Sequence, residues 1–176
     1  MNRFLLSLAL GAAAVSTPAL AGDFDGPYIG AQAGVALLHV EGDILTGPVD
    51  KTSTTGYGAA VLGYRLDAGG VVLGIEGDAG THVDGGDARY GVSAIAGLPI
   101  GSRSLVYGRV GYVWHDGLPA DVGKGVTVGG GFETKLTGPV NVRLDYKYLA
   151  LGKTDIPDNT LSYTGHEVTA GVVIGF

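Results

Sequence analysis

The chain has 176 residues, of which 33 are glycine and none is cysteine, and its formal net charge is −6. A disulfide framework and a thiolate metal site are therefore excluded, and the mild acidity argues against nucleic-acid binding, which needs a basic patch. The apolar content is too high for a disordered chain, and the length suits a single domain.

The amino terminus has the pattern of a secretory signal peptide. Arg3 supplies a basic start, residues 4–15 form an apolar run, and residues 19–21 read Ala-Leu-Ala, a small-x-small cleavage site. The apolar run is too short to span a membrane as a helix. We predict cleavage after Ala21, which leaves residues 22–176 as one exported domain.

Eight segments of the exported domain alternate between two kinds of side chain. Successive side chains of an extended strand leave opposite faces, so this alternation predicts eight β-strands. The predicted strands are residues 27–40, 55–66, 71–81, 88–100, 105–115, 124–136, 140–152 and 161–176.

The strand that begins at Val140 shows the pattern most clearly. Its apolar face carries Val142, Leu144, Tyr146 and Tyr148, and its other face carries Asn141, Arg143, Asp145 and Lys147. Such a strand needs an apolar medium on one side and a polar, charge-compensated space on the other.

The connections between the predicted strands alternate in length. Polar loops, of which residues 41–54 are the longest, alternate with the tight turns at residues 67–70, 101–104 and 137–139. Long loops at one end and tight turns at the other are typical of outer-membrane barrels. We therefore predict an all-β, eight-stranded antiparallel up-and-down transmembrane β-barrel, located in the outer membrane.

A soluble eight-stranded barrel would show the same alternation with its apolar face inside. Glycine beside the charged residues favours the membrane barrel, because a narrow charged interior needs neighbours without side chains. The chain also stops on Phe176, an aromatic on the apolar face of its last strand. Aromatic residues near both ends of the apolar faces predict two girdles at the membrane surfaces, formed by Tyr64, Tyr90, Trp114, Phe132, Tyr148 and Phe176.

The stretches SAIAGLPI, LVYGRVGYVW, VGGGFETKLTGPVNVRLDYKY and GVVIGF resemble the transmembrane domain of OmpA and the wider group of small eight-stranded outer-membrane barrels, the opacity-type porin family. The resemblance implies that Phe176 is the signal read by the barrel-assembly machinery. The chain ends at Phe176, so the peptidoglycan-binding domain that follows the OmpA barrel is not expected. Ile95 and Val61 stand where the family keeps an inward lysine and an inward acid.

The charged faces of the strands predict an ion-pair network in the lumen. Its predicted members are Glu76, Asp78, Arg109, Glu133, Arg143, Asp145, Lys147 and Glu167. Charges in a narrow barrel lose hydration and must pair. The network either fills the lumen as a structural core or forms a narrow gated pore, in which five acids against three bases would favour cations.

The outer loops are acidic, from Glu41 to Asp158. These acids either keep the rim solvated or contact lipopolysaccharide through divalent cations, or they recognise a host or phage partner. None has the spacing of a calcium loop, and no metal site or cofactor is predicted. We expect a monomer whose partners are the lipid bilayer and lipopolysaccharide, with no nucleic acid.

An enzyme is not expected. A hydrolase needs a serine and a histidine within hydrogen-bond reach and an acid that orients the base. Ser162 and His166 share the outward face of the last strand, but no acid accompanies them there. The first prediction is therefore a structural outer-membrane barrel, with a narrow pore or a surface-recognition protein as alternatives.

Overall fold

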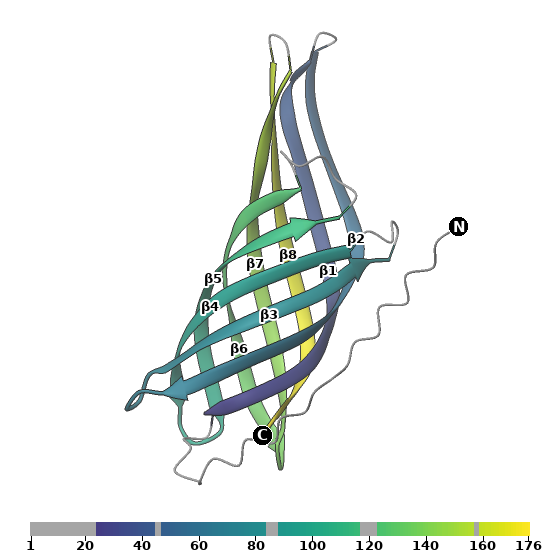
Figure 1. The fold of residues 1–176 in the computed structure, drawn as a ribbon. Coiled ribbons are helices and arrows are strands. Elements are labelled where there is room, and N and C mark those ends of the chain that lie inside the picture. The colour runs from purple at the N-terminus through teal and green to yellow at the C-terminus, as the bar shows by residue number, and fades with distance from the viewer. Residues whose placement is uncertain (1–23, 45–46, 84–87, 117–122, 157–158) are drawn as a thin grey trace, which may run out of the picture.

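The computed structural model describes residues 24–44, 47–83, 88–116, 123–156 and 159–176. Eight antiparallel strands close into a barrel in the order β1 to β8, and β8 pairs with β1 (Figure 1). The strands are β1 Gly26–Ile44, β2 Gly47–Asp67, β3 Val72–His82, β4 Ala88–Ile100, β5 Ser104–His115, β6 Lys124–Thr137, β7 Val140–Ile156 and β8 Asn159–Gly175. The predicted eight-stranded up-and-down barrel is confirmed, whereas the predicted signal peptide lies outside the described residues.

No α-helix in the described part of the chain is long and apolar enough to cross a membrane.

The two faces of the barrel wall have the predicted orientation. In β7, Arg143 and Asp145 are 3% and 1% exposed, whereas Leu144 and Tyr146 are 54% and 45% exposed. Ionised side chains thus fill the interior and apolar side chains cover the outside, which is the reverse of a water-soluble barrel.

Glycines shape the tight turns at one end of the barrel, called here the turn end. Between β2 and β3, Asp67 Oδ1 accepts hydrogen bonds from the N–H groups of Gly69 and Gly70, both at 3.0 Å. These glycines have φ of +79° and +98°, a conformation that other residues rarely adopt.

The predicted loop at residues 41–54 is wrong. β1 continues to Ile44 and β2 begins at Gly47, with Val40 opposite Lys51 in the ladder between them. The predicted gap between the last two strands is likewise reduced, because β7 runs to Ile156 and β8 begins at Asn159. Since β8 pairs with β1, the strands β7, β8, β1 and β2 rise together beyond the other four (Figure 1).

This raised four-stranded sheet has an open edge along β2. Tyr57 pairs with His82, the last residue of β3, and Val83 N donates to Gly56 O at 2.9 Å. Beyond that point, residues 47–55 of β2 pair only with β1 among the residues that the structure describes. Four consecutive side chains here, from Lys51 to Thr54, are exposed.

Candidate functional site

Ten buried ionised side chains lie in the described lumen. The structure places all eight predicted residues there, each at most 6% exposed, and adds Arg65 and Arg89 at 2% and 0%. The lumen therefore holds five acids and five bases. The predicted acidic excess is wrong, and with it the reason to expect cation preference.

Two acids and two arginines form the middle of the network. Arg143 Nε lies 2.6 Å from Asp145 Oδ2, and Arg143 Nη1 lies 2.5 Å from Glu76 Oε2. Arg109 bridges the same two acids, at 2.8 Å to Glu76 Oε1 and 3.1 Å to Asp145 Oδ1, and it also donates to Ser93 Oγ at 3.1 Å. Each carboxylate is therefore held by both arginines.

A single ion pair lies nearer the turn end of the lumen. Arg65 donates two parallel hydrogen bonds to the carboxylate of Glu133, at 2.9 and 2.7 Å, the bidentate geometry that guanidinium favours. Asn141 Nδ2 donates a third to Glu133 Oε1 at 2.7 Å.

The remaining four charges lie toward the opposite end of the lumen, called here the loop end. Arg89 pairs with Glu167 and, at 2.9 Å, with Asp78 Oδ2. Lys147 Nζ approaches the same two acids, at 3.4 Å to Asp78 Oδ1 and 3.6 Å to Glu167 Oε1. Among the described ion pairs, the network thus divides into three groups, each with as many acids as bases.

Three lumen tyrosines connect the charges in a repeated arrangement. Tyr28 has the guanidinium of Arg65 over its ring, 4.0 Å from the ring centre, and its hydroxyl donates to Glu76 Oε2 at 2.8 Å. The equivalent contacts are Tyr57 with Arg89 and Asp78, and Tyr107 with Arg143 and Asp145.

Each of these tyrosine rings lies over a glycine of a neighbouring strand. A Cβ atom on Gly63 would lie 2.2 Å from Tyr28 Cζ, one on Gly131 2.5 Å from the Tyr107 hydroxyl, and one on Gly80 2.6 Å from the Tyr57 hydroxyl. Glycine therefore makes room for the rings, as the sequence pattern indicated. The tyrosines themselves were not predicted as part of the network, although Tyr28 and Tyr107 occur on its glycine-rich faces.

The predicted girdle residues lie on the outside of the barrel. Five of them are exposed, and Tyr148 is half-buried because it packs against His166, with ring centres 5.2 Å apart. Tyr90 and Trp114 stack across β4 and β5 with ring centres 6.3 Å apart. Phe176 is 77% exposed, and its backbone N–H donates to Pro27 O at 3.0 Å.

His166, which was considered above together with Ser162 as a possible catalytic pair, has a tyrosine as its hydrogen-bond partner. His166 Nδ1 lies 2.8 Å from the hydroxyl of Tyr146 on the exposed face. No group of three or more potential metal ligands occurs within the described residues. Of the rim acids, Glu41 and Asp116 are exposed, whereas Asp84, Asp87, Asp121 and Asp158 lie outside the described part of the chain.

Comparison with known proteins agrees with this geometry. The family described as outer membrane protein beta-barrel domain matches residues 6–176. The solved structure of Neisserial surface protein A (NspA) superposes with a TM-score of 0.55 and 17% sequence identity, covering 86% of this chain and 98% of that one. De novo designed transmembrane β-barrels reach 0.47 at 10% identity, covering 81% and 95%. No curated protein matches the sequence.

Ail, the attachment invasion locus protein of Yersinia pestis, solved with the heparin analogue sucrose octasulfate, is a more distant structural neighbour. Its TM-score is 0.38 at 14% identity, and the alignment covers 85% of this chain and 99% of that one. At 17% identity, the likeness to NspA concerns the fold alone.

Proposed function

We propose that this chain, which belongs to the outer membrane protein β-barrel domain family, is a structural protein of a Gram-negative outer membrane whose lumen is closed by ion pairs. The three neutral groups of lumen charges support this proposal most strongly. An eight-stranded barrel has an interior just wide enough for its own side chains. Here those side chains include ten charges, each paired with an opposite charge within hydrogen-bond distance.

The cost of separating these pairs argues against a pore that opens spontaneously. Opening a path past the middle group would separate Arg143 from Glu76 and Asp145 together. Leaving a buried charge without its partner costs about 3–5 kcal/mol. The closed lumen is therefore expected to be the dominant state.

Planar-bilayer recording of the refolded protein tests this function. We expect no discrete conductance steps from wild-type protein whose folding is verified by heat-modifiable migration on a gel. Regular openings that disappear in Arg143→Ala or Glu133→Ala would instead identify the chain as a narrow pore.

The outer surface supports contact with the bilayer and with lipopolysaccharide. Exposed apolar side chains cover the wall, and aromatic residues such as Trp114 and Phe132 occur toward its two ends. The exposed Phe176 is available to the barrel-assembly machinery as a carboxyl-terminal signal. No catalytic role is proposed for any residue of this surface.

The raised sheet supports a second candidate function, the recognition of an external protein. An open strand edge presents unpaired N–H and C=O groups that can accept an extended segment of a partner. The β2 edge at residues 47–55 is such an edge, and its exposed residues Lys51 to Thr54 leave it accessible.

A shortened hairpin tests the recognition role. Leu38 lies opposite Ser53, so residues 39–52 can be replaced by Asn-Gly, a dipeptide suited to a two-residue hairpin turn. We expect cells that display this variant to lose binding to host-cell surfaces, whereas Lys51→Glu, which keeps the backbone edge, retains it. Equal binding by the shortened and wild-type proteins would exclude recognition through this edge.

A further inference from the structure

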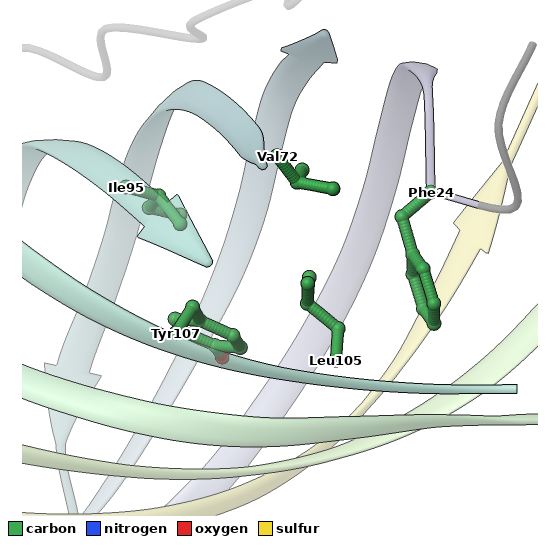
Figure 2. Close-up of a cluster of buried hydrophobic side chains, with 5 residues drawn as sticks. All are labelled: Phe24, Val72, Ile95, Leu105 and Tyr107. Atoms are coloured by element: carbon green, nitrogen blue, oxygen red, sulfur yellow. The ribbon is translucent and has the colours of Figure 1, made fainter. Parts of the chain in front are cut away.

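A cluster of buried, mainly apolar side chains begins at the turn end of the lumen. It consists of Phe24, Val72, Ile95, Leu105 and Tyr107, each at most 5% exposed (Figure 2). Val72 is the first residue of β3 and Leu105 the second residue of β5, which places these two members beside the tight turns, whereas Ile95 lies deeper, opposite Arg109 in the ladder between β4 and β5. Leu105 is the register partner of Glu133, so the cluster lies next to the Arg65–Glu133 pair.

Phe24 differs from the other members because it does not belong to a strand. It precedes β1, and Figure 2 shows its ring extending from that segment toward Leu105. The other four side chains come from β3, β4 and β5 and are fixed by their ladders. Lys135 Nζ lies 5.6 Å from the centre of the Phe24 ring.

The backbone of Gly26 bends the chain so that the side chain of Phe24 reaches the turn end of the lumen. Its φ of +104° is a conformation that residues with a side chain rarely adopt, and a Cβ atom there would lie 2.7 Å from the carbonyl oxygen of Phe176. The carboxylate of Asp25 also accepts a hydrogen bond from the Gly26 N–H at 3.0 Å. The bend before β1 is thus fixed locally, at the point where the first and last strands meet.

We propose that Phe24 is an internal stopper that seals the turn end of the lumen independently of the ion-pair network. The backbone of Phe24 takes no part in the barrel ladders. The side chain can therefore leave the apolar cluster while every strand pair remains intact. Its departure exposes the apolar surfaces of Val72, Ile95 and Leu105 to solvent at the turn end. Access to the lumen from the turn end is then controlled by one side chain, which comes from the segment that precedes β1.

Thiol labelling in detergent tests the stopper, because the natural chain has no cysteine and a single introduced one reports on its own site. Leu105→Cys places a thiol at a fully buried position of the cluster. We expect slow reaction with a charged maleimide when Phe24 is present and at least tenfold faster reaction in the Leu105→Cys, Phe24→Ala protein. Phe24→Leu, which retains an apolar side chain, is expected to keep the reaction slow.

Two controls make the result decisive. A cysteine at the exposed Ser102 is expected to react rapidly with or without Phe24, and heat-modifiable migration verifies that each variant is folded. Equal Leu105→Cys labelling rates with and without the Phe24→Ala substitution in folded protein would overturn the proposal. Failure of the Phe24→Ala protein to fold would overturn it as well, because a separable stopper is not needed to form the barrel. Val72→Cys, also fully buried, provides a second reporter if Leu105→Cys disturbs packing.

Discussion

Replacing Arg143 by methionine is expected to lower the free energy of unfolding by about 3–5 kcal/mol. Arg143 is buried and pairs with both Glu76 and Asp145, the latter through Nε at 2.6 Å. Its loss leaves Arg109 alone to neutralise two carboxylates. The measurement is urea unfolding in lipid vesicles, followed by the heat-modifiable gel shift.

Arg103→Met is the matched control for this substitution. Arg103 is exposed beside a tight turn, and its side chain donates a long hydrogen bond of 3.4 Å to Leu136 O. Surface substitutions of this kind usually change stability by less than about 0.5 kcal/mol. Equal unfolding midpoints for the two variants would mean that the lumen pairs do not stabilise the barrel.

Gly34→Ala is expected to destabilise the barrel by about 1–3 kcal/mol, the range for overpacked interiors. A Cβ atom on Gly34 would lie 1.9 Å from Val168 O and 2.7 Å from Thr169 Cα, both backbone atoms of β8. Backbone in a ladder cannot rotate aside as a side chain can. β1 and β8 must therefore separate locally, at the pairing that closes the barrel.

Gly175→Ala is the control in the same pair of strands. It pairs with Tyr28 between β8 and β1, and no atom lies within 4 Å of a Cβ placed there. Both variants gain the same methyl group and lose the same unfolded-state freedom. If refolding yield and urea midpoint were alike for the two, backbone crowding at Gly34 would not be the reason glycine stands there.

The alternation of side chains was sufficient to predict the barrel, and the glycines beside the charged residues, together with the aromatic residues of the apolar faces, predicted the orientation of its wall. The alternation failed where both faces of a strand meet water, since residues such as Lys51, Thr52 and Ser53 are exposed on either face. Period-two hydrophobicity then disappears although the ladder continues. The extensions of β1 and β2 therefore resembled a polar loop.

Three residues of the lumen, Arg65, Arg89 and Phe24, were not predicted from the sequence, for related reasons. Arg65 shares its face with Gly63 and Val61, but it occurs just before a tight turn, where an arginine is ordinarily solvated. Arg89 follows an acidic loop and could be assigned to the rim. Phe24 precedes the first strand, so no periodicity indicated that its side chain enters the lumen.

The pairing of β8 with β1 also determines how the molecule responds to force. β8 spans 17 residues and is bonded on one flank to β7 and on the other to β1. Force applied at Phe176 cannot detach β8 from one open edge, because β8 is paired on both flanks. The force must shear the ladders with β1 and with β7 at the same time. β1 and β8 have 19 and 17 residues, more than any of β3 to β6, so mechanical resistance is concentrated where the first and last strands pair, and extraction is easier to start among the shorter strands β3 to β5 on the opposite side.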